Sequence, residues 1–101
     1  MLEEPPTQPA RGFALDRPWR VSEGVALRPE PFGALAYHFG TRRLSFLKSR
    51  ALLGVVQSLA EYPTAREACR ATGVDEAELP RYERALATLA ETGMISEGSQ
   101  E

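Results

Sequence analysis

The sequence predicts an α+β fold in which a three-stranded antiparallel sheet is followed by three helices. Apolar residues alternate with a period of two between residues 25 and 47, and aromatic residues are frequent there, which is typical of short strands. From residue 52 onwards the apolar residues recur with helical spacing instead. The chain of 101 residues is long enough for one small domain.

Three runs of residues carry the strand pattern, at 25–28, 34–39 and 42–47. Gly and Pro residues separate the first run from the second, and Gly40-Thr41 separates the second from the third. Because the runs are close in sequence, an antiparallel meander is their simplest connection. In the third run Leu44 and Phe46 share one face of the strand.

The first helix is expected to begin after Ser49, whose hydroxyl can cap its first turn, and to end before Tyr62-Pro63. Its apolar stripe consists of Leu52, Val55, Val56 and Leu59. Gly54 lies inside this helix and lowers its stability by about 1 kcal/mol relative to Ala. We therefore expect tight packing against Gly54.

Two further helices follow. Thr64 and Glu67 have the spacing of a capping box and open a short second helix that ends at Gly73. The third helix is expected to begin at Asp75 and to end at Gly93, with a kink or restart at Pro80. Its apolar stripe consists of Leu79, Tyr82, Leu86 and Leu89.

The two ends of the chain have a different composition from its middle. Residues 1–17 contain three prolines and few large apolar side chains, and residues 96–101 are small or polar. Neither stretch can bury enough apolar surface to offset the entropy lost on ordering. We therefore predict flexible tails at 1–17 and 96–101, and a single folded domain at 18–95.

Composition argues against an enzyme. His38 is the only histidine and Cys69 the only cysteine, so a two-histidine metal site and an internal disulfide are both excluded. No glycine-rich phosphate loop is present. We expect structural roles for His38 and Cys69, no metal and no cofactor. No apolar run is long enough to cross a bilayer, and we expect a cytoplasmic protein without a membrane partner.

Charge is divided unevenly along the chain. Residues 11–50 hold eight Lys or Arg against three Asp or Glu, whereas residues 51–101 hold four against nine. This division has two interpretations. It is either a solvated surface that happens to be polarised, or the sign of an acidic partner for the first half.

The spacing of Cys69, Gly73 and Val74 between two capped helices is typical of a helix-turn-helix, which predicts a winged-helix-like arrangement. A small DNA-binding regulator is therefore the alternative function. In such a protein the start of the recognition helix enters the major groove. Here that position carries Asp75, Glu76 and Glu78, which would repel phosphates. We therefore predict no nucleic-acid partner.

The stretches ALRPEPFGAL and YHFGTRRLSFLK, within residues 25–48, are long and specific. They resemble the mycofactocin biosynthesis peptide chaperones, a family similar to the chaperone of pyrroloquinoline quinone synthesis. The resemblance extends over residues 19–95. It implies a non-catalytic protein that captures the acidic leader of a ribosomally made precursor peptide. A radical S-adenosylmethionine maturase then receives the peptide.

The same resemblance implies where the peptide binds. The leader would add as a strand to the edge of the third strand, in a groove beside the third helix. The expected peptide-binding residues are Arg42, Arg43, Leu44, Ser45, Phe46, Arg81, Tyr82, Ala85, Leu86 and Leu89. For Leu44, Phe46, Leu86 and Leu89 plain core packing is the alternative. A winged-helix protein that only docks other proteins is a further alternative, because edge-strand binding leaves no side-chain signature.

Overall fold

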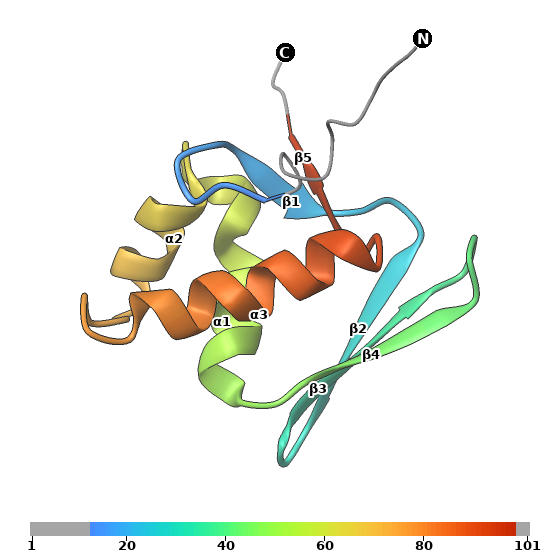
Figure 1. The fold of residues 1–101 in the computed structure, drawn as a ribbon. Helices are drawn as coiled ribbons and strands as arrows, with labels where there is room; N and C mark the ends of the chain where they lie inside the picture. Colours follow the sequence, from blue (N-terminus) through green and yellow to red (C-terminus); the bar gives the residue numbers. More distant parts are fainter. Residues whose placement is uncertain (1–12, 99–101) are drawn as a thin grey trace, which may run out of the picture.

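The computed structural model describes residues 13–98 of the chain. In sequence order its elements are the strands β1 (Trp19–Val21), β2 (Val25–Glu30), β3 (Gly33–His38) and β4 (Arg43–Leu47), the helix α1 (Arg50–Ser58), the 3-10 turn η2 (Leu59–Glu61), the helices α2 (Ala65–Ala71) and α3 (Leu79–Glu91), and the strand β5 (Ile95–Glu97). Figure 1 shows the sheet of β2, β3 and β4 extending to one side of the helices. The predicted α+β fold is confirmed.

The three-stranded sheet is an antiparallel meander in the order β2-β3-β4. Its inner face carries small side chains on the central strand, because Ala34 and Ala36 are fully buried and α1 packs against β3. Leu47 of β4 is also fully buried on this side. The larger side chains of β3, Leu35 and Tyr37, therefore lie on the opposite, outer face of the sheet.

The helix boundaries follow from local capping. The Ser49 hydroxyl accepts the amide of Leu52 at 3.0 Å, and the Thr64 hydroxyl accepts the amide of Glu67 at 3.1 Å. Both predicted N-caps are thus confirmed. The expected packing against Gly54 is wrong, because a Cβ atom at this position would meet no heavy atom within 4 Å.

The third helix begins later than predicted. Residues 75–78 form a turn, closed by the Glu78 amide donating to the Asp75 carbonyl at 2.9 Å, and α3 begins at Leu79. Pro80 therefore lies in the first turn of the helix, where its missing N–H has no intrahelical partner to lose. Of the predicted kink or restart, the structure has the restart: the turn ends and α3 begins one residue before Pro80, without a kink in a continuous helix.

The packed part of the chain extends beyond 18–95 at both ends. Strand β1 pairs with β5, and the sequence analysis missed this small sheet. Leu15 is buried, and the Trp19 indole N–H donates to the Ala14 carbonyl at 2.9 Å. Residues 13–17 and 96–97 thus belong to the folded unit. The rest of the predicted tails, apart from Gly98, lies outside the described residues.

His38 and Cys69 have structural surroundings, as predicted. The His38 Nδ1 accepts the amides of Gly40 and Thr41, at 3.0 and 3.3 Å, and so holds the turn between β3 and β4. Cys69 is fully buried in the core, and this burial raises the pKa of its thiol. Within residues 13–98, no helix has the length and apolar character needed to cross a bilayer.

Candidate functional site

Strand β4 lies at the edge of the three-stranded sheet. Within residues 13–98 it pairs only with β3, so one side of its backbone has no strand partner. An open edge of this kind exposes N–H and C=O groups that another extended chain can pair with. The edge is five residues long, from Arg43 to Leu47.

A groove runs beside this edge, between β4 and α3. Its larger hollow, of about 580 Å³, is lined by Leu44, Ser45, Phe46, Lys48, Leu52, Ala85, Thr88 and Leu89. A smaller hollow of about 210 Å³ shares part of this lining, and is bordered by Lys48, Ser49, Leu52, Arg81, Tyr82 and Ala85. The α3 residues recur every three or four positions, so they form a single face of the helix.

The groove has an apolar floor and one polar bridge. Leu52 of α1 and Leu89 of α3 are almost fully buried, and they contribute the floor beneath the opening. The hydroxyls of Ser45 and Thr92 lie 3.4 Å apart and connect β4 to the end of α3. The end of α3 therefore lies near the middle of β4, and the helix forms the opposite wall of the groove.

Most of the predicted peptide-binding residues meet at this groove. Leu44, Ser45, Phe46 and Leu89 line the larger hollow, Arg81 and Tyr82 line the smaller one, and Ala85 lines both. Arg42 and Arg43 are exposed at the β3–β4 turn, outside both linings, and Arg42 has a left-handed φ of 64°. Leu86 is fully buried and lines neither hollow.

The alternative of core packing has different outcomes for the four apolar residues. It is correct for Leu86 and Leu89, which are 0% and 4% exposed and belong to the core. It is wrong for Leu44 and Phe46, which are 53% and 56% exposed. Phe32, which is 46% exposed and stacks on Phe46, extends these two side chains into one exposed apolar patch, and contiguous patches of this kind are typical of interaction sites.

Sequence reasoning missed four residues of the lining, Lys48, Ser49, Leu52 and Thr88. Thr88 could have been found from helical spacing, because it follows Ala85 by three positions on the same face. Leu52 was assigned only to the apolar stripe of α1. Its position under the groove depends on how α1 crosses β4, and no local pattern encodes that crossing.

The charge at the groove is positive. Lys48 and Arg81 both border the smaller hollow, and no carboxylate lines either hollow. Among the described residues, neither cation forms an ion pair. An incoming carboxylate would therefore find an unneutralised cation at this end of the groove.

The α2–α3 region does not have the charge of a DNA-reading surface. Asp75, Glu76 and Glu78 are exposed in the turn before α3. Only Glu76 of these three has a cationic partner among the described residues, Arg70 at 3.1 Å. A helix approached by phosphates would therefore carry uncompensated carboxylates at its leading end.

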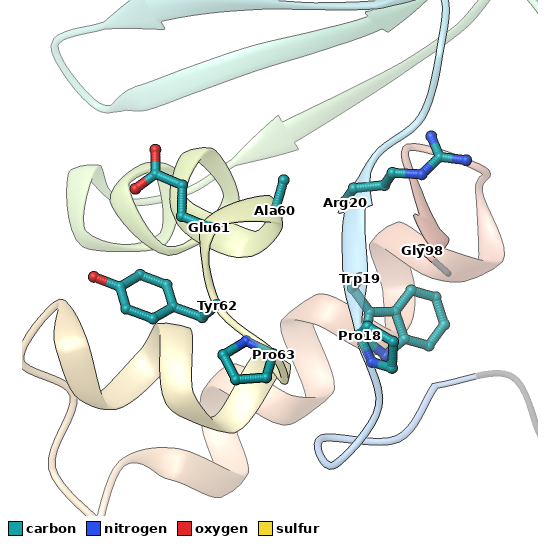
Figure 2. A pocket seen from close by; sticks show the side chains of 8 residues that line it. All are labelled: Pro18, Trp19, Arg20, Ala60, Glu61, Tyr62, Pro63 and Gly98. Atoms are coloured by element: carbon teal, nitrogen blue, oxygen red, sulfur yellow. The ribbon is translucent and has the colours of Figure 1, made fainter. Parts of the chain in front are cut away.

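A second hollow, of about 480 Å³, lies between β1 and the turn that precedes α2. Figure 2 shows Pro18, Trp19 and Arg20 on one side of it and the segment from Ala60 to Pro63 on the other. Trp19 itself is buried, so its ring forms part of the wall. Its lining includes Trp19 and Arg20 of β1, a three-residue strand that pairs with β5 alone among the described strands, and no sequence pattern predicted this hollow.

Comparison with known proteins identifies the family. The family model described as the peptide chaperone MftB family matches residues 18–96. The chain is similar to the peptide chaperone MftB of Mycobacterium ulcerans (strain Agy99), with 57% identity over 93 residues, which cover 89% of this chain and 85% of the relative. It is similar to the protein of the same name from Mycobacterium tuberculosis (strain H37Rv), with 58% identity over 83 residues, covering 82% and 76%.

A third relative, the peptide chaperone MftB of Mycolicibacterium smegmatis, is 51% identical over 89 residues, which cover 88% of this chain and 87% of the relative. No solved structure matches the chain. The matched region includes both walls of the groove, β4 and α3. The chain therefore belongs to the peptide chaperone MftB family, and its role is non-catalytic.

Proposed function

We propose that this chain captures the leader of a precursor peptide as an added strand on β4 and delivers it to a radical S-adenosylmethionine maturase in mycofactocin biosynthesis. The observation that carries the proposal is the open edge of β4 beside the groove under α3. Membership of a family of peptide chaperones supports a peptide as the occupant of that edge. We expect the capture to take place in the cytoplasm.

Strand addition fits the character of the site. Main-chain hydrogen bonds to β4 would supply affinity, and alternate side chains of the peptide would enter the groove. There they meet the apolar floor formed by Leu52, Ala85 and Leu89. The open edge requires no rearrangement of the fold before a peptide can pair with it.

The cations near β4 suit an acidic leader. Arg42 and Arg43 lie at one end of the strand, and Lys48 with Arg81 at the other. Exposed charges of this kind act mainly on the rate of encounter and on the choice of partner. Affinity would come chiefly from backbone pairing and apolar contact.

A proline comparison tests strand addition. Leu44 and Ser45 are consecutive on β4, so the N–H of one points toward β3 and the N–H of the other toward the open edge. Proline removes the donor at its position. One of Leu44→Pro and Ser45→Pro should disrupt the hairpin, and the other should stay folded by circular dichroism and lose precursor-peptide binding. Alanine at the same position is the control and should retain binding.

The outcome that would contradict strand addition is a folded proline variant that binds the peptide as well as its alanine counterpart. N-methylation of alternate amides in the synthetic precursor peptide gives the same test from the other side. It leaves the chaperone unchanged, and it should abolish binding for one set of alternate positions. The pathway is tested separately by the genes adjacent to the coding sequence, which should encode a short peptide ending in Val-Tyr and a radical enzyme.

A further inference from the structure

A strand added to β4 must place its side chains alternately on two sides of the sheet. One side is the groove, whose floor is apolar. The other is the outer face of the sheet, where Leu44 and Phe46 stand opposite Tyr37 and Leu35 of β3. The polarity of the side chains on both sides of the sheet therefore determines which peptide sequences can bind.

The outer side is also apolar along β4, where Leu44 and Phe46 extend from the rim of the groove onto the outer face. Leu44 and Phe46 are 53% and 56% exposed, although they are large apolar side chains. Phe32, which is 46% exposed, stacks on Phe46 with ring centroids 6.0 Å apart. Cross-strand neighbours of an added strand would contact this row directly.

The ends of β4 are positively charged. Arg42 and Arg43 flank one end, and Lys48 follows the other end, where Arg81 borders the same hollow. None of these four cations pairs with a carboxylate within residues 13–98. Strand β4, from Arg43 to Leu47, spans about 17 Å in extended conformation, so a paired segment of about five residues extends from one charged end to the other.

We propose that the captured segment is a continuous apolar run of about five residues with carboxylates at both ends, and not an alternating apolar and polar strand. An alternating segment would fill the groove and place polar side chains against Leu44 and Phe46. A continuous run makes apolar contact on both sides. The charge of the two ends favours an acidic peptide over a second copy of this chain, whose own β4 would bring like charges together. This inference rests on the proposed function and specifies the sequence that the site accepts.

Three fluorescein-labelled synthetic peptides test it by fluorescence anisotropy with the full chain. The first has Val-Leu-Val-Leu-Val between pairs of Asp, the second has Val-Ser-Val-Ser-Val between the same pairs, and the third has the first core between pairs of Lys. The first should bind about tenfold more tightly than the second, since two cross-strand apolar contacts are lost. It should also bind more tightly than the third at low salt, with a difference that shrinks as salt is added.

The Phe46→Ser variant tests whether the difference in affinity between the first two peptides arises at the outer face of β4. Phe46 is exposed, so the substitution should leave the fold intact, and it should remove most of the difference between the first two peptides. The matched control is Phe39→Ser, because Phe39 is 64% exposed but follows β3 and does not belong to β4, whose edge the peptide would join. This control should preserve the tenfold difference.

The outcomes separate the two proposals. Equal affinity for the first two peptides would overturn the continuous run and leave strand capture standing. Failure of all three peptides, and of the precursor peptide itself, would overturn both. A chain that sediments as a dimer, and as a monomer after Phe46→Ser, would show that a second copy covers the outer row, which also contradicts this inference.

Discussion

Gly33 and Leu47 approach each other so closely across β3 and β4 that a side chain at position 33 would overlap the Leu47 carbonyl oxygen. Gly33 also has a φ of +153°, which side chains rarely adopt. The first residue of β3 can therefore reach the last residues of β4 only as glycine. A Cβ atom at Gly33 would also lie 2.7 Å from the backbone nitrogen of Ser49, a residue that borders the groove.

Gly33→Ala should consequently lower the free energy of unfolding by about 3 kcal/mol, because both the overlap and the backbone conformation oppose a Cβ atom. Gly54→Ala is the matched control, since Gly54 lies in α1 with open space around its Cα. That substitution should raise stability by about 0.5–1 kcal/mol. Urea denaturation of both variants measures the two effects. Similar values for the two would contradict the close approach of β3 and β4.

Reversing the charge beside β4 should slow peptide association. Arg42→Glu combined with Arg43→Glu replaces attraction of an acidic leader with repulsion, and we expect a several-fold lower association rate at low salt. Added salt should reduce the difference, because exposed charges are screened within about 8 Å at physiological ionic strength. Stopped-flow fluorescence at two salt concentrations measures both effects.

The control for this reversal has the same change in net charge at a distance from the groove. Arg20 of β1 and Arg70 of α2 are exposed and line neither hollow beside β4, so Arg20→Glu with Arg70→Glu should leave the association rate nearly unchanged. If both double variants slowed association equally, the net charge of the protein would determine the association rate, and the position of the cations beside β4 would not matter.

The buried thiol of Cys69 should make stability depend on pH in the alkaline range. Burial raises the pKa of Cys69 in the folded chain, so the unfolded chain loses this proton first as pH rises. The contribution of this thiol to the free energy of unfolding is therefore fully present below the ordinary thiol pKa of about 8.5, and it decreases as pH rises above that value. Urea denaturation between neutral and alkaline pH should show a steeper decline for the parent than for Cys69→Ala. Parallel curves would contradict the shift.

Duplex DNA should not be retained at physiological salt. The exposed carboxylates of Asp75, Glu76 and Glu78 occupy the leading end of α3, where a recognition helix would meet phosphates. A gel-shift assay with competitor DNA measures this. A complex that survives the competitor and disappears in Arg81→Ala with Arg84→Ala would favour the DNA-binding alternative.

The sequence by itself determined the order of the elements and the main helix caps. The period-two run that includes Leu44 and Phe46 predicted β4, because alternation is a local property of an extended chain. Ser49 and Thr64 predicted two helix starts, since a capping hydroxyl acts on an amide three residues away. The helical spacing of Leu79, Tyr82, Leu86 and Leu89 predicted the apolar stripe of α3, of which Leu79, Leu86 and Leu89 are buried.

Only the tertiary structure decided what depends on contacts between distant segments. The pairing of β1 with β5 joins residues 19–21 to residues 95–97, and three-residue strands leave too little pattern to be recognised locally. Periodicity showed that Leu44 and Phe46 share a face, but only the packing of α1 on the alanine face of β3 determined that this face is the exposed one. Leu52 lies in the groove floor for the same reason. A sequence pattern specifies which residues share a face of a helix or strand. Which element packs against that face, and so whether the face is buried or exposed, depends on the tertiary structure.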